Sequence, residues 1–140
     1  MITNKIDNYL RYNYAKRFYK KHSLEFTSIE NYLNHTYSDS INSMRNNKLY
    51  WEFATEMKIN KIKYLNPNAY DYDKFLDNKL EKLGFPMVSY NPNTKVISYD
   101  FIVFPNFYFS NRFYFSIINF SKAFGAMPLG DEYYLIIDDE

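Results

Sequence analysis

The chain has 140 residues, a formal net charge of +1 and no cysteine. This length is typical of one domain, here 1–140, with a single substantial core. The lack of cysteine excludes disulfides, thiolate nucleophiles and Cys-ligated zinc.

The aromatic share of 21% is far above ordinary usage, and it lies in 16 Tyr and 13 Phe residues with one Trp. Asn, Lys, Ile, Tyr and Phe make up about half of the chain and have AT-rich codons. Part of the aromatic excess is therefore expected from an AT-rich genome, such as that of a low-GC bacterium, a phage or a mobile element. No apolar leader and no bilayer-length apolar run stands out, so we expect a cytoplasmic protein without cofactor or metal.

The near-neutral net charge hides an asymmetry between the two ends. Residues 1–24 contain six Lys and Arg residues against Asp7 alone, and residues 125–140 contain five acidic residues and no basic one. The two ends either attract each other in the fold or form two separate contact surfaces.

The sequence predicts an α+β fold that begins with about four helices over 4–83. The first helix spans 4–21, where Ile6, Leu10, Tyr14 and Phe18 recur every four residues as an apolar stripe. A different face of this helix gathers Lys5, Tyr9, Tyr12, Lys16, Tyr19 and Lys20.

Three more helices are predicted downstream. Thr27–Glu30 reads as a capping box for a short helix to about Tyr37, and a longer helix is expected from about Ser40 to Ile59. The clearest pattern covers 70–83, and Gly84 ends it. Its expected buried seam is Tyr72, Leu76, Leu80 and Leu83.

The second half, 86–138, is predicted to be a small antiparallel sheet with one helix. Residues 87–104 alternate in polarity around the Asn91–Thr94 turn and indicate a hairpin, and Tyr133–Asp138 indicates a last strand. The segment 104–120 is ambiguous. It fits either a strand to about 109 followed by a helix over 112–124, which we favour, or two strands joined at Ser110-Asn111.

The favoured helix divides the aromatic segment into core and surplus rings. Its expected core stripe is Phe113, Ile117, Phe120 and Phe124. The rings off that stripe are Phe107, Tyr108, Phe109, Tyr114 and Phe115. Since Tyr and Phe are enriched at protein interfaces, Tyr108 and Tyr114 are predicted partner contacts, together with the charged pair Asp131 and Glu132.

Catalytic signatures are weak. The three glycines form no phosphate-binding motif, His35 and Asp39 form a lone i,i+4 pair, and Glu56 belongs to an E-x-K sequence within a predicted helix. No catalytic residue and no metal ligand is therefore predicted, and we expect a protein that is not an enzyme. A metal-dependent nuclease is the third-ranked alternative.

The expected function is that of a small protein that binds and blocks a larger protein or protein–nucleic acid complex. The composition favours a phage- or mobile-element-encoded inhibitor of a bacterial defence complex (anti-CRISPR-like), or an immunity protein. The alternative is a nucleic-acid-binding module, in which the first helix offers Lys5, Lys16 and Lys20 to phosphates and its tyrosines to bases.

Overall fold

The computed structural model describes residues 2–38, 50–54, 58–59, 62–63, 70–84, 87–103, 113–122 and 125–138. The side chains of 2–8, 58–59, 62–63 and 138 lie outside the description. The described helices are α1 (Ile2–Lys21), α2 (Ser23–Thr36) and α4 (Lys74–Leu83). The strands are β1 (Trp51–Ala54), β2 (Lys58–Ile59), β3 (Ile62–Lys63), β4 (Met87–Tyr90), β5 (Ile97–Val103), β6 (Phe113–Ile118), β7 (Met127–Gly130) and β8 (Tyr133–Asp138).

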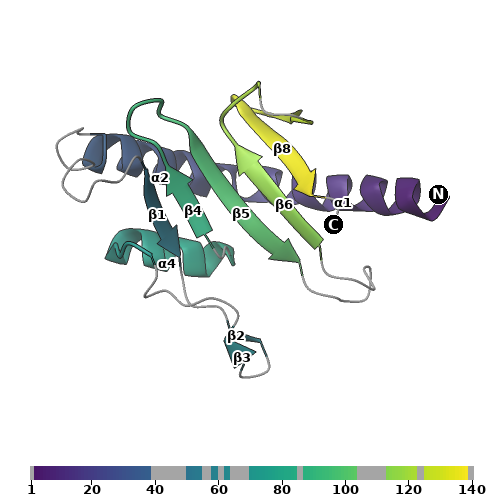
Figure 1. Ribbon diagram of the computed structural model, residues 1–140, viewed down its shortest axis with the longest axis horizontal. Helices are drawn as coiled ribbons and strands as arrows, with labels where there is room; N and C mark the ends of the chain where they lie inside the picture. The colour runs from purple at the N-terminus through teal and green to yellow at the C-terminus, as the bar shows by residue number, and fades with distance from the viewer. Residues whose placement is uncertain are drawn as a thin grey trace.

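The fold is α+β, and its main element is a six-stranded antiparallel sheet in the order β1-β4-β5-β6-β8-β7 (Figure 1). Strands β2 and β3 form a separate two-stranded ribbon. The predicted β4–β5 hairpin is confirmed, with Val88 opposite Tyr99 and Tyr90 opposite Ile97. The predicted last strand is confirmed as β8, which pairs with both β6 and β7.

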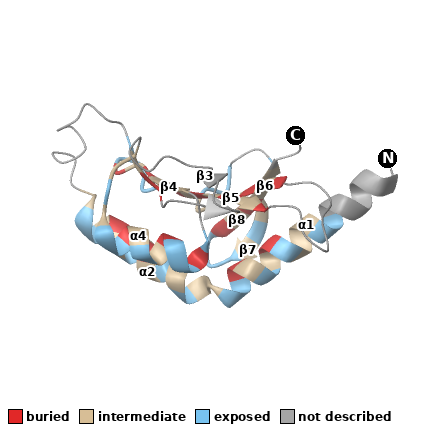
Figure 2. Ribbon diagram, turned by 90° about the horizontal axis from the view of Figure 1, so that it is seen from below, coloured by how far each residue is buried: buried red, intermediate tan, exposed pale blue. Residues whose placement is uncertain are grey.

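The helices lie on one face of this sheet and leave the other face without a helix in the described part of the chain (Figure 2). Strand β5 shows the consequence in its burial, which alternates residue by residue from Ile97 to Val103. An antiparallel sheet covered on one side requires this period of two.

The predicted helix over 112–124 is wrong, because 113–118 form the inner strand β6. Phe113, Phe115 and Ile117 point to the covered face and are at most 2% exposed. Phe113 and Ile117 fit a helical period as well as a strand period, but β5 and β8 pair with this segment on both sides and satisfy its backbone. Phe120, an expected core residue, is 40% exposed, while Phe124 and the segment 104–112 lie outside the described residues.

The first half also differs from the prediction of four helices, since the described residues of 2–84 form three. Residues 51–54 are the edge strand β1 and 58–59 are β2, where a helix to Ile59 was expected. The alternation in WEFA explains β1, because Trp51 and Phe53 share one face and both contact the Tyr37 ring. Residues 39–49, including the expected helix start at Ser40, lie outside the described part.

Helix α2 begins four residues earlier than the predicted capping box. Only His22 separates it from α1, and the Thr27 hydroxyl donates to the backbone oxygen of Ser23 at 3.1 Å, as a threonine inside a helix does. The predicted end near Tyr37 is confirmed, because Tyr37 is the C-cap of α2.

Helix α4 confirms most of the predicted 70–83 helix. Leu76, Leu80 and Leu83 are buried, and Gly84 ends the helix with φ 72°, a left-handed conformation that favours glycine. The helix begins later than expected, with Asp73 as N-cap. Tyr72 therefore precedes it and is 75% exposed, rather than part of the buried seam.

Aromatic rings fill the space between the helices and the sheet. The Phe26 ring of α2 meets the Tyr99 ring edge-on at 4.8 Å, and the rings of Phe101 and Phe115 stack at 4.4 Å. These four residues are at most 4% exposed. The core thus accounts for many of the rings that the composition left unexplained, including Phe115, which the sequence analysis placed among the surplus rings.

Candidate functional site

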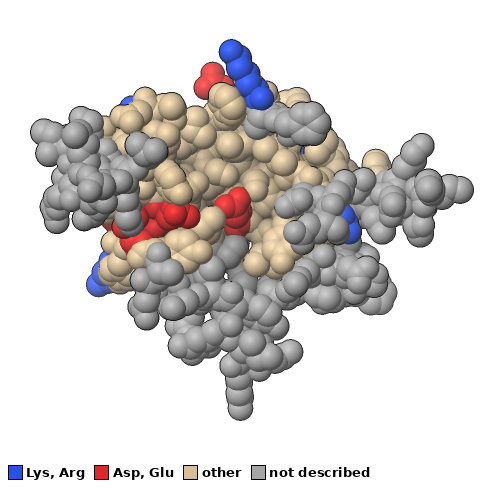
Figure 3. All heavy atoms as spheres, viewed as in Figure 1, with Lys and Arg blue, Asp and Glu red and all other residues tan. Residues whose placement is uncertain are grey.

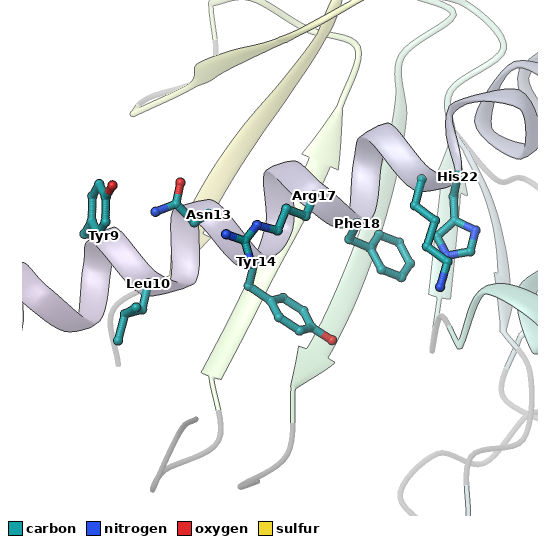
Figure 4. Close-up of a pocket in the computed structure, with 8 residues that line it drawn as sticks. Tyr9, Leu10, Asn13, Tyr14, Arg17, Phe18 and His22 are labelled. Atoms are coloured by element: carbon teal, nitrogen blue, oxygen red, sulfur yellow. The ribbon is translucent and has the colours of Figure 1, made fainter. Parts of the chain in front are cut away.

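A groove of about 680 Å³ runs along α1 (Figure 4). All the described residues that line it belong to α1 and to His22, which follows it. They form two series with a spacing of four residues. The first series is Tyr9, Asn13, Arg17 and Lys21, and the second is Leu10, Tyr14, Phe18 and His22.

The second series forms an apolar wall that is anchored in the core. The Tyr14 ring lies edge-on to the rings of Phe113 at 6.2 Å and Phe115 at 6.3 Å. The Phe18 ring lies 5.0 Å from the Phe101 ring and 4.6 Å from the His22 ring. Tyr14 nevertheless remains 40% exposed, as does Leu10. The wall is therefore apolar, accessible and fixed in place by contacts behind it.

The first series forms a polar and basic wall. Tyr9 is 67% exposed, and the side chains of Arg17 and Lys21 are also exposed. Since no acidic residue is among the described lining, the groove presents positive charge beside apolar surface. Lys20 and Lys21 also lie in the last turn of α1, where positive charge is favourable at a helix C-terminus.

The apolar stripe predicted for the first helix lies only partly against the core, because Tyr14 and Phe18 contact core rings while Leu10 is 40% exposed. The buried residues of α1 are Ala15 and Tyr19, and Tyr12 packs against the core beside them. These three positions are spaced i, i+3 and i+7, which places them on one side of a helix. Rings occur on every side of α1, so ring periodicity alone did not reveal which side is buried. The side chain of Ile6 lies outside the description.

The predicted nucleic-acid-binding residues do not form one surface. Tyr19 is 3% exposed, and its hydroxyl donates to the backbone oxygen of Gly130 at 3.1 Å and to Asp131 Oδ2 at 3.3 Å. Burial, and then the negative charge of Asp131, raise the pKa of Tyr19 to about 12. Tyr12 and Lys16 are both half-buried, with Lys16 Nζ 5.7 Å from the centre of the Tyr12 ring, and Tyr9 and Lys20 are exposed. The side chain of Lys5 lies outside the description.

The predicted partner contacts lie away from the groove. Tyr114 is half-buried on the face of β6 opposite to Phe113 and Phe115. Asp131 and Glu132 form the exposed β7–β8 turn, and both have positive φ. Tyr108 is outside the described residues. The Tyr19–Asp131 hydrogen bond places the acidic β7–β8 turn beside α1, the helix that carries the basic residues.

The sheet face without helices carries several acidic side chains among its described residues (Figure 3). Figure 3 shows this face, with acidic side chains near its middle and Lys and Arg at its margins. Asp100 lies on it and accepts a hydrogen bond from the Ser116 hydroxyl at 2.7 Å. Burial raises the pKa of Asp100, and the Ser116 hydrogen bond offsets part of that rise.

The described residues offer little for catalysis. They contain no group of three or more His, Asp or Glu residues placed to hold a metal ion. His35 is exposed on α2, while its predicted partner Asp39 and the carboxylate Glu56 lie outside the described part. No described helix is both long and apolar enough to cross a membrane.

Comparisons with known proteins give no relative. No family model, no curated protein and no solved structure matches the chain.

Proposed function

We propose that this protein is not an enzyme and acts by binding a larger protein through the α1 groove. The observation that carries the proposal is the pairing of an accessible apolar wall, Leu10 and Tyr14, with a basic wall, Arg17 and Lys21. Exposed apolar surface beside charged residues is characteristic of protein interaction sites. The positive charge selects an acidic partner surface.

The rigid support of the groove favours this function. Tyr14 and Phe18 are held against Phe113, Phe115 and Phe101, so ordering these rings on binding costs little side-chain entropy. Aromatic side chains and arginine also dominate the energetic centres of protein interfaces. A small protein with a preorganised binding surface can act by blocking a larger partner. The AT-rich composition favours a phage- or mobile-element-encoded inhibitor.

Nucleic acid is the second candidate occupant, because Tyr9 offers an accessible ring on the same side of α1 as Arg17 and Lys21. Two features weigh against it. The net charge of +1 is low for a dedicated nucleic-acid binder. Leu10 also contributes aliphatic surface, which neither phosphates nor stacked bases require.

A comparative pull-down tests the proposal. The immobilised protein is exposed to lysate of its native cell, with and without nuclease treatment, and retained proteins are quantified by mass spectrometry. The test variant carries Arg17→Glu and Lys21→Glu. The matched control carries Lys74→Glu and Lys82→Glu, two exposed charge reversals on α4.

We expect one protein that wild type and the α4 control retain equally, and that the α1 variant retains at least about tenfold less, as for loss of an interface hot spot. Equal retention by the α1 variant contradicts the proposal. Binding that nuclease treatment abolishes supports the nucleic-acid alternative instead.

A further inference from the structure

The groove has the geometry of a helix-packing surface. Positions 9, 13, 17 and 21 form one i±4 ridge of α1, and positions 10, 14, 18 and 22 form the adjacent one. Helices pack by inserting a ridge of one into the groove between two ridges of the other. In Figure 4 Tyr9 and Asn13 leave α1 on one side, and Leu10 and Tyr14 leave it on the other.

We propose that the occupant of the groove is an acidic amphipathic α-helix of the partner protein. This inference rests on the proposed function, because it specifies the segment that enters the same site. The partner helix places apolar residues against Leu10, Tyr14 and Phe18, and Asp or Glu residues against Arg17 and Lys21.

The dimensions of the site fix the length of that helix. The lining extends from Tyr9 to His22, which at 1.5 Å per residue is about 20 Å. A helix that follows the groove therefore uses about 14 residues, or four turns. Its apolar anchors recur at i, i+3 or i+4, and i+7, as in other helix-in-groove complexes.

Backbone hydrogen bonding favours a helix over an extended segment. Extended peptides commonly gain affinity by pairing their backbone with an exposed sheet edge. The α1 backbone bonds within its own helix and offers no such edge along this groove. A helical occupant satisfies its own backbone and contributes side chains alone, which is what this site accommodates.

Charge decides between an acidic helix and other amphipathic helices. Arg17 and Lys21 lie one turn apart on the same ridge, so acidic residues four apart on the occupant meet both. A basic or neutral helix leaves these cations unpaired and loses the long-range attraction that an acidic helix has at low salt.

Selection from a random library tests this inference without knowledge of the natural partner. The probe is a displayed library of 14-residue peptides, selected on the full-length protein alone. The enriched peptides are then tested for binding to the Arg17→Glu, Lys21→Glu variant. We expect enriched sequences without proline that combine apolar residues at i, i+3 or i+4, and i+7 with flanking Asp or Glu. Circular dichroism of the mixture should show helix gained on binding.

Two variants locate the binding site. Affinity of the enriched peptides should fall at least about tenfold with Leu10→Asp and with the Arg17→Glu, Lys21→Glu double variant. The Lys74→Glu, Lys82→Glu control should bind like wild type. The double variant changes only exposed charges. Its loss of binding therefore locates the site even if Leu10→Asp unfolds the protein.

The contrary outcomes are distinguishable. Enriched sequences that contain proline or lack a helical period, but still require Arg17 and Lys21, overturn the helix and leave the proposed docking site intact. Peptides that bind the double variant as tightly as wild type contradict both the helical occupant and the proposed docking site. A selection with no enriched sequence also overturns the acidic helix as occupant.

Discussion

The ring of Tyr14 stands edge-on against the ring of Phe113, with centroids 6.2 Å apart and planes inclined by 83°. This contact joins a groove wall on α1 to the inner strand β6, 99 positions away along the printed chain. Tyr14 therefore has two roles, since its inner edge packs on the core while it remains 40% exposed at the groove.

The double role predicts a graded effect of substitution at Tyr14. Tyr14→Ala removes contacts with two rings and should lower the free energy of unfolding by about 1–2 kcal/mol. Tyr14→Phe keeps the ring and should change it by less than about 0.5 kcal/mol. Urea denaturation measures both, and a wild-type midpoint for Tyr14→Ala would show that the ring contacts contribute nothing.

The strand assignment of β6 predicts which aromatic truncations damage the core. Phe115→Ala removes a ring that is 2% exposed and should cost about 3–5 kcal/mol of stability. Phe120→Ala removes a ring that is 40% exposed and should cost less than about 1 kcal/mol. Thermal unfolding of the two variants compares them, and equal losses would favour the helical stripe that contained Phe120.

The hydrogen bonds of the Asp73 carboxylate predict that the free energy of unfolding falls in acid. Its Oδ1 accepts from the Leu76 amide at 3.0 Å, and its Oδ2 accepts from the hydroxyls of Tyr32 at 2.7 Å and Tyr37 at 2.5 Å. Burial acts to raise the pKa of Asp73, but these hydrogen bonds outweigh it, so the pKa lies below its ordinary 3.8. The stabilisation is therefore complete above the unfolded-state pKa and is lost as the pH falls through the folded-state pKa.

Substitutions at Asp73 separate its cap from its charge. Asp73→Ala should cost about 2 kcal/mol at neutral pH, because it removes the N-cap and leaves two phenols without their acceptor. Asp73→Asn keeps an acceptor oxygen and removes the titration. Its stability relative to wild type should rise as the pH falls below about 4, and a constant difference across that range would argue against a lowered pKa.

Asp100 predicts the opposite pH dependence. Because burial raises its pKa, its contribution to stability is greatest at low pH and declines as the pH rises through the folded-state pKa. Asp100→Asn should thus be more stable than wild type near neutral pH, with the difference vanishing in acid. Ser116→Ala removes the hydrogen bond that favours the carboxylate and should enlarge the neutral-pH loss. Denaturant titrations at several pH values test both variants.

The β7–β8 turn predicts a stabilising substitution. Glu132 has φ 67°, a left-handed conformation that costs a residue with a Cβ roughly 1–2 kcal/mol. Glu132→Gly should raise stability by about 0.5–1 kcal/mol, since glycine adopts this conformation without strain but is less ordered when unfolded. Glu132→Ala removes the same charge without relieving the strain and is the matched control. A similar melting temperature for the two variants would attribute any gain to the lost charge.

Local signals allowed α4, the β4–β5 hairpin and β8 to be predicted from sequence. Gly84 marks a helix end wherever the helix packs, and alternation over 97–103 indicates a half-covered strand without knowledge of its neighbours. Strand β6 escaped prediction because Phe113 and Ile117 satisfy both periods, and pairing with β5 and β8 decides between them. That pairing depends on contacts distant in sequence, which a local pattern does not contain.

Part of the candidate site was predicted from the sequence. Leu10, Tyr14 and Phe18 were identified as one stripe of the first helix, but the fully buried side of α1 was not predicted. Ala15 decides that side, because its small side chain is fully buried on the flank where Tyr19 enters the core. A search for a small residue with rings three positions before it and four positions after it would have found Ala15 between Tyr12 and Tyr19.

Site-specific photo-crosslinking tests the groove as a docking site most directly. A photoreactive residue replaces Asn13, which lines the groove, or Asn78, which is exposed on α4. Each protein is irradiated in nuclease-treated lysate of its native cell. We expect one covalent protein adduct from position 13, lost when Arg17→Glu and Lys21→Glu are added, and none from position 78. An adduct from position 78 alone, or one from position 13 that persists in the double variant, would contradict docking at the groove.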